Sequence, residues 1–213
     1  MGMTKDRFAA LWNRCVADGA VAKSAPLYEE LWRRYSEPHR RYHTPDHISH
    51  CLQQLDLAAK LMDDPDAVEM GLWFHDVIYN PRATDNELKS AQLFAELVND
   101  HIDPDFRQSV FDLILITTHP EQPARLDEKF IVDIDLSSFA LPWDHFQQDS
   151  DAVRQEYAHI SDEKFFPNHL QFLRALVDRP TFFFTDFFRG RYETTARENV
   201  ARYMADLGKQ GFS

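Results

Sequence analysis

Prolines mark where helices can begin in this chain, and they constrain its fold more than any other feature. Thr44-Pro45 and Asp103-Pro104 each combine a helix-capping side chain with proline at the first helical position. After each pair, apolar residues recur at intervals of three and four, which is the spacing of one helix face. One such face comprises Ile48, Cys51, Leu52, Leu55 and Ala59. This punctuation predicts a series of amphipathic helices.

The same spacing predicts helices over most of the chain. They lie at about residues 4–18, 24–35, 45–63, 66–80, 84–98, 103–119, 149–160, 168–177 and 193–207. Gly208 is predicted to end the last helix. The segment Phe130–Leu136 alternates apolar and acidic residues, which favours a strand, whereas its motif favours a short helix. The sequence therefore predicts one all-α domain over residues 1–213.

Composition and charge narrow the classes of function. The formal net charge of −12 disfavours a general binder of nucleic acid or of anionic membranes. A small anionic substrate would need only a local cluster of Arg and Lys. No apolar run approaches the roughly 20 residues that span a bilayer. Cys15 and Cys51 are predicted to be free thiols in a reducing cytosol, so we expect a cytoplasmic protein.

The adjacent pair His75-Asp76 lies in the otherwise apolar stretch Gly71–Tyr79. An imidazole beside a carboxylate is costly to bury unless something binds both groups. A divalent cation would do so, because neutral imidazole and carboxylate are both metal ligands. Further candidate ligands lie before and after the pair, at His43, His47, His119, Asp133 and Asp135.

These residues resemble a known family, the HD-domain metal-dependent phosphohydrolases. That family orders a histidine, a His-Asp pair and a late aspartate on a helical bundle, as do His47, His75-Asp76 and Asp135 here. The closer similarity is to a branch of predicted hydrolases of about this length, and it runs from about residue 38 to residue 205. Its further matches are Tyr42-His43, Asn86-Glu87, Ser90-Ala91, Asp133–Leu136, Arg154, Glu156-Tyr157 and Ala196–Asn199.

The resemblance implies an HD-domain-like helical bundle that holds a divalent metal at His47, His75, Asp76 and Asp135. Asp133 is the rival of Asp135 for the last position. A set of imidazoles and carboxylates without thiolate permits manganese, magnesium, iron, nickel, cobalt or zinc. The metal would supply hydroxide near neutral pH and polarise a phosphoryl group.

Roles beside the metal follow from the same resemblance. Glu87 is the candidate that orients or deprotonates the attacking water, with Asp85 in reserve. Thr84–Glu87 also fits a capping box, so Glu87 has a purely structural alternative. His43 and His119 would donate to phosphate or bind a second metal, or instead position a loop and end a helix. The predicted substrate-binding residues are Arg41, Tyr42, His43 and Lys89, with Arg154 as a further cation.

The sequence thus predicts hydrolysis of a phosphate ester or anhydride in a nucleotide or related small phosphorylated metabolite. One alternative is pyrophosphohydrolysis of a guanosine tetraphosphate-type alarmone, which a basic pocket around Arg40, Arg41 and Lys89 would favour. Another is a non-catalytic module that binds metal or nucleotide and signals through a partner. We expect neither a nucleic-acid polymer nor a membrane as partner. The aromatic residues from Phe182 to Phe188 indicate core packing or a homodimer contact.

Overall fold

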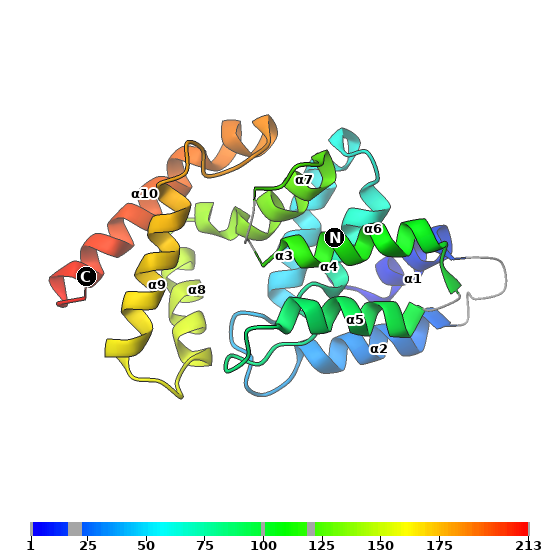
Figure 1. Cartoon of the computed structure of the whole chain (residues 1–213), viewed down its shortest axis with the longest axis horizontal. Helices are drawn as coiled ribbons and strands as arrows, with labels where there is room; N and C mark the ends of the chain where they lie inside the picture. Colours follow the sequence, from blue (N-terminus) through cyan, green and yellow to red (C-terminus); the bar gives the residue numbers. More distant parts are fainter. Residues whose placement is uncertain (1, 17–22, 99–100, 119–121, 213) are drawn as a thin grey trace. The chain divides into compact units, whose positions relative to one another are not determined.

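The structure, a computed structural model, describes residues 2–16, 23–98, 101–118 and 122–212, and these residues are mainly helical (Figure 1). They contain no β-strand, although Val16 and Ile102 form an isolated bridge. The all-α prediction is confirmed. None of the described helices is both long and apolar enough to cross a membrane.

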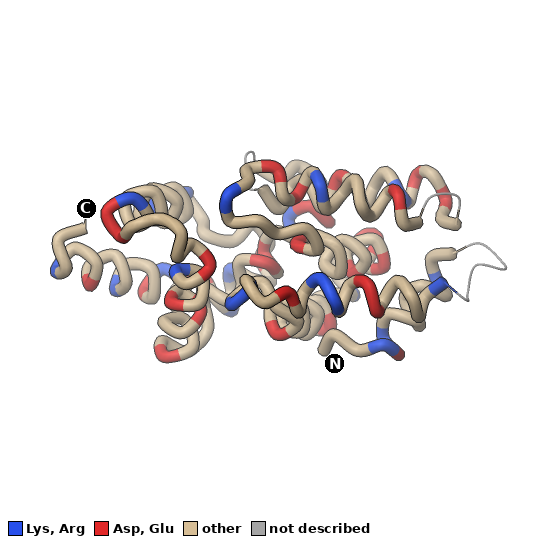
Figure 2. The backbone as a smooth tube through the Cα atoms, turned by 90° about the horizontal axis from the view of Figure 1, so that it is seen from below, with Lys and Arg blue, Asp and Glu red and all other residues tan. Residues whose placement is uncertain are grey.

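Contacts between residues group the chain into two compact units, Met1–Asp135 and Leu136–Ser213, here called unit 1 and unit 2. Unit 1 contains α1 (Lys5–Cys15), α2 (Ser24–Tyr35), α3 (Pro45–Ala58), η2 (Ala59–Leu61), α4 (Pro65–Phe74), α5 (Asn86–Val98), α6 (Pro104–Ile116) and α7 (Leu126–Asp135). Unit 2 contains η4 (Leu136–Ala140), α8 (Trp143–Glu156), α9 (Asp162–Val177) and α10 (Asp186–Lys209). One domain over residues 1–213 stays a prediction. Within each unit, Lys and Arg are scattered among Asp and Glu along the helices (Figure 2).

The predicted helix starts in unit 1 have the expected caps. Thr44 Oγ1 accepts a hydrogen bond from the Asp46 amide at 3.4 Å, and α3 begins at Pro45. Asp103 Oδ1 accepts from the amides of Asp105 and Phe106, and α6 begins at Pro104. These side chains satisfy amides that have no partner within the helix.

Helix α4 is the centre of unit 1, where it packs against α1, α3, α5, α6 and α7 (Figure 1). Every residue from Ala67 to Phe74 is buried, so α4 is apolar on all sides except at Glu69. At Gly71 a Cβ atom would lie only 2.9 Å from Cδ1 of Ile131 on α7. A glycine at this position therefore allows α4 and α7 to approach closely.

The ambiguous segment Phe130–Leu136 is helical, which is the interpretation that its motif favoured. Residues Phe130 to Asp135 complete α7, and η4 continues from Leu136. Phe130, Ile131, Val132, Asp133 and Ile134 are all buried. Because the segment is buried on every side, the alternation in its sequence does not reveal its conformation.

Several boundaries in unit 2 differ from the predictions. Helix α9 begins at Asp162 and contains Pro167, whose neighbourhood is exposed, so water can satisfy the carbonyl left without a partner. Helix α10 begins at Asp186, where Thr185 caps the amide of Phe188. The chain turns at Gly211, with φ of 95°, rather than at Gly208. There the Phe212 amide bonds back to the Leu207 carbonyl, which closes the helix end.

Candidate metal centre

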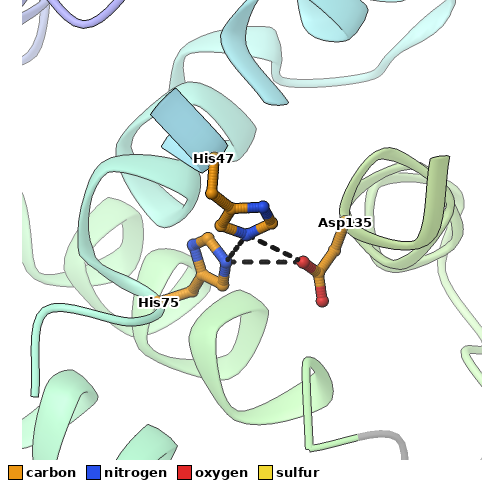
Figure 3. A group of neighbouring side chains, drawn as sticks. All are labelled: His47, His75 and Asp135. Atoms are coloured by element: carbon orange, nitrogen blue, oxygen red, sulfur yellow. Dashed lines mark hydrogen bonds and ion pairs between the residues drawn. The ribbon is translucent and has the colours of Figure 1, made fainter. Parts of the chain in front are cut away.

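Four polar side chains from three regions of unit 1 converge on one point, and Figure 3 shows three of them, His47, His75 and Asp135. His47 Nε2 lies 3.3 Å from His75 Nε2 and 3.3 Å from Asp135 Oδ1. Asp76 Oδ2 lies 3.0 Å from His75 Nε2 and 3.5 Å from His47 Nε2. Between 1% and 17% of each of these side chains is exposed. The structure brings together the residues that the resemblance implied as ligands.

Local structure explains why each side chain reaches this point. His47 is in the first turn of α3, which Thr44 and Pro45 start two residues earlier. His75 is the C-terminal cap of α4, and its amide bonds to Gly71 O at 2.8 Å. Adjacent residues within a helix point about 100° apart. Because α4 ends at Phe74, the chain turns after it, and His75 and Asp76 can both face the centre.

Asp135 is the last residue of α7 and supplies the oxygen that faces both histidines. The rival candidate Asp133 is completely buried two residues earlier. Among the described residues, Asp135 rather than Asp133 joins His47 and His75 in a group that could hold an ion.

The atoms that face one another in the centre are mainly hydrogen-bond acceptors. His75 Nδ1 lies 3.0 Å from Leu72 O, so we assign its proton to Nδ1 and a lone pair to Nε2 in the neutral ring. That lone pair and the oxygens of Asp76 and Asp135 are all acceptors. His47 Nε2 is the one atom of the four that a neutral side chain could protonate, and it faces all three acceptors within 3.5 Å. A cation would satisfy every one of these atoms.

The spacing of His47 Nε2, His75 Nε2 and Asp135 Oδ1 fits a metal ion, and Asp76 Oδ2 lies close to both nitrogens. Ligands about 2.1 Å from a metal lie about 3.0 Å apart in an octahedron and about 3.4 Å apart in a tetrahedron. The distance between the two histidine nitrogens, and the distances from each nitrogen to the facing oxygens of Asp76 and Asp135, run from 3.0 to 3.6 Å. His75 Nδ1–H donates a hydrogen bond to the Leu72 carbonyl. A bond of this kind from the second ring nitrogen orients histidine ligands in proteins.

Electrostatics in the centre oppose the usual effect of burial. Burial lowers the pKa of His75, but the carboxylates of Asp76 and Asp135 outweigh it and raise that pKa well above its ordinary value. Burial raises the pKa of Asp76, but charge on His75, His43 and His47 outweighs it and holds that pKa well below its ordinary value. Without a metal the centre therefore favours a proton between ionised carboxylates, and a metal must displace that proton.

Glu87 lies beside this centre. It is half-buried on α5, and burial raises its pKa, a hydrogen bond from its own backbone amide opposes this, and the carboxylates of Asp76 and Asp135 raise the pKa further. Helix α5 begins at Asn86, so Glu87 is its second residue rather than the third position of a capping box opened by Thr84. Asp85, the reserve candidate, forms an ion pair with Lys89 at 2.7 Å.

Aromatic rings form one side of the centre. Tyr42 packs on His47 with ring centroids 4.8 Å apart, and His43 stacks on Tyr79 at 4.1 Å. His43 is also close enough to lower the pKa of Asp76. The prediction for His119 falls outside the described residues.

The predicted phosphate-binding cations are engaged elsewhere. Arg41 is exposed and donates to the carbonyls of Pro38 and Arg40. Lys89 pairs with Asp85. Arg154 belongs to unit 2, where it donates to Tyr157 O and Ile160 O and pairs with Asp162.

Sequence reasoning placed Cys51 only on the inner face of the helix and gave His50 no role, yet both are neighbours of the centre. The Cys51 thiol is buried with Sγ 3.7 Å from His47 Nε2. His50 is half-buried, and burial together with nearby His47 lowers its pKa to about 4. Both lie one turn after His47 on α3, so their spacing of three and four residues was the signal that could have identified them.

No protein-family model, curated protein or solved structure matches this chain. The chemistry of the centre is inferred from its own geometry.

Proposed function

We propose that this protein is a divalent-metal-dependent phosphohydrolase that cleaves a phosphate ester in a small metabolite such as a nucleotide. The observation that carries the proposal is the convergence of His47, His75, Asp76 and Asp135. Nε2 of each histidine lies 3.0 to 3.6 Å from a carboxylate oxygen of Asp76 and from one of Asp135. The resemblance of the sequence to HD-domain phosphohydrolases supports the same reaction.

The donor set suits a hard or borderline divalent ion. Two imidazole nitrogens and two carboxylate oxygens are compatible with manganese, magnesium, iron, nickel, cobalt or zinc. Such an ion, when bound, supplies Lewis acidity for a phosphoryl group and lowers the pKa of water. The protein's own contribution is to hold His47, His75 and Asp135 at fixed positions in a nearly dry interior.

Glu87 is the group in this proposal that takes a proton from the attacking water. Its raised pKa makes it a stronger base than an exposed carboxylate. Glu87 is half-buried on α5, close enough to Asp76 and Asp135 for their carboxylates to raise its pKa. In this proposal His43, which stacks on Tyr79 beside Asp76, donates a hydrogen bond to a phosphate oxygen.

The charges around the centre favour a phosphate monoester over an alarmone. Arg40 donates to backbone carbonyls, Arg41 donates to two others, and Lys89 pairs with Asp85. A basic pocket from these three residues was the feature that would have favoured a highly charged substrate. Within unit 1, the contacts of these cations therefore support the less charged substrate.

Metal analysis followed by a phosphatase screen tests the proposal. We expect purified wild-type protein to carry a divalent metal and Asp76→Ala to carry none, because Asp76 faces both histidines. With added manganese, the wild type should release phosphate from nucleoside monophosphates more readily than from di- or triphosphates. Asp162→Ala is the matched control, since Asp162 is an exposed carboxylate paired with Arg154 in unit 2.

Two results would contradict the proposal in different ways. If Asp76→Ala keeps as much metal as the wild type, the centre does not bind the metal. If the metal-loaded wild type releases no phosphate from any of these substrates, the site is not a nucleotide phosphatase, and a metal-binding module becomes the better description.

A further inference from the structure

Arg40 is a buried arginine next to the candidate metal centre. It lies between α2 and α3, and its side chain is 0% exposed, whereas the adjacent Arg41 is exposed. An arginine cannot lose its charge under ordinary conditions, so its burial requires several partners. Those partners show what its position achieves.

The guanidinium connects the two segments that carry three of the four converging side chains. Its Nη1 donates to His43 O at 3.0 Å and to Asp76 O at 2.8 Å, and its Nη2 donates to Val77 O at 3.0 Å. His43 O lies just before α3, which carries His47. Asp76 O and Val77 O belong to the turn that presents His75 and Asp76.

The orientation of the guanidinium is also restrained. Its central carbon lies 5.1 Å from the ring centroid of Tyr35 and 5.5 Å from that of Tyr79. Its Nε makes no hydrogen bond but lies 3.5 Å from Glu37 Oε2, which supplies a counter-charge. A planar fork held between two rings can donate to fixed carbonyls in only one arrangement.

We propose that Arg40 is a positioning residue of the metal centre, which sets the separation between His47 on α3 and Asp76 after α4. It does so through the backbone, because it binds the carbonyl of Asp76 itself and that of His43, four residues before His47. This inference rests on the proposed metal centre, and it assigns to Arg40 a role other than binding the substrate.

The competing interpretation is that Arg40 only stabilises the fold. Unit 2 contains a matched case, since Arg197 donates to Val177 O and Arg179 O and so joins a loop to α10 with the same chemistry. None of the converging residues lies in unit 2, which begins at Leu136. A purely structural arginine should behave like Arg197.

The test measures cobalt(II) and manganese(II) affinity by calorimetry on the full chain, for wild type, Arg40→Lys, Arg40→Met and Arg197→Lys. Loss of a group that orients a metal ligand typically weakens metal binding by about 10- to 100-fold. We expect that loss in Arg40→Lys, because an ammonium cannot bridge three carbonyls as a fork does, and a larger loss in Arg40→Met. Arg197→Lys should bind both metals like the wild type while its metal-free form unfolds at a lower temperature.

The outcomes separate the inference from the proposed function. A wild type that binds neither metal overturns the centre and the inference together. A wild type that binds, with Arg40→Lys binding equally well, overturns only the role of Arg40. If Arg40→Met does not fold, Arg40→Lys decides, because lysine keeps the charge and an apolar stem between the two rings. A shifted visible spectrum of bound cobalt(II) in Arg40→Lys would support altered ligand geometry directly.

Discussion

Unit 1 and unit 2 both contain side chains that bond to the backbone, such as Arg40 and Arg197, but unit 1 also contains a cluster of buried side chains that face one another. In unit 2, Glu193 accepts hydrogen bonds from the amides of Phe182 and Phe183. Asn199 donates to the carbonyls of Phe139 and Leu141. In unit 1, by contrast, His75 and Asp76 face other side chains that also accept hydrogen bonds.

The difference separates structural polar groups from those that await a ligand. A side chain whose donors and acceptors are all bonded to the backbone joins segments of the chain. It has no donor or acceptor left for a ligand. A set of buried acceptors pointing at one another is unfavourable unless a cation or proton lies between them. Partner type, rather than burial or charge, is therefore what identifies the centre in unit 1.

The largest expected effects come from removing one side chain of each kind, a converging side chain in unit 1 and a backbone-bonded side chain in unit 2. His75→Ala should lose metal and turnover, because it removes a nitrogen that faces His47, Asp76 and Asp135. Asn199→Ala should instead lower the free energy of unfolding by about 1–3 kcal/mol, because two carbonyls lose their donor. Turnover per folded molecule, measured with chemical denaturation of each variant, checks both. A folded Asn199→Ala protein without turnover would break the comparison.

Two glutamates allow the next comparison. Glu87→Gln should slow turnover by about 10²- to 10⁴-fold, since an amide cannot accept the proton of water. Its metal content should be unchanged, and its stability should not fall, because burial already disfavours the charged form of Glu87. Glu193→Gln should leave turnover intact and destabilise the protein by about 1 kcal/mol, because Glu193 is bonded to two amides and to Arg197. Steady-state kinetics and thermal unfolding measure both; an unfolded Glu87→Gln protein would show that Glu87 acts as a cap.

The last comparison concerns His169 in unit 2, whose pKa is shifted in the opposite direction to that of His75 in unit 1. Burial lowers the pKa of His169 in unit 2 from 6.5 to about 4, where its ring stacks on Phe165. The unfolded chain therefore binds more protons than the folded chain between these values, and stability falls as the pH falls from about 6.5 to 4. The loss should be about 2–3 kcal/mol, and His169→Leu should remove it. Denaturant unfolding of the metal-free protein across this range measures it, and a His169→Leu protein with undiminished pH dependence would refute the assignment.

The fold was predictable from the sequence where its signals are local. Thr44-Pro45 and Asp103-Pro104 marked helix starts correctly, because a cap and a proline act within a few residues. The start of α9 was missed because Pro167 is tolerated inside an exposed turn. The end of α10 was missed because the reversal lies at Gly211 rather than Gly208.

The sequence predicted which residues form the candidate centre, but not that Arg40 lies behind it. His47, His75, Asp76 and Asp135 could be named from residue type and order, and the structure brings them together. Arg40 was grouped with Arg41 as a substrate cation, because a loop sequence does not show which of two arginines points inward. Hydrogen-bond partners far apart in sequence decide that question.

The contact between Gly71 and Ile131 has a consequence for ion selectivity. Gly71 precedes His75 by one helical turn on α4, and Ile131 precedes Asp135 by one turn on α7. In the proposed metal centre, we expect the close approach at this pair to influence the separation of His75 Nε2 and Asp135 Oδ1 one turn later, which is 3.6 Å. Metal–oxygen distances differ between ions, at about 2.0–2.1 Å for magnesium and about 2.3–2.6 Å for calcium. Side-chain volume at positions 71 and 131 would thus act as a size filter, and the preferred ionic radius could be retuned there without altering a single ligand.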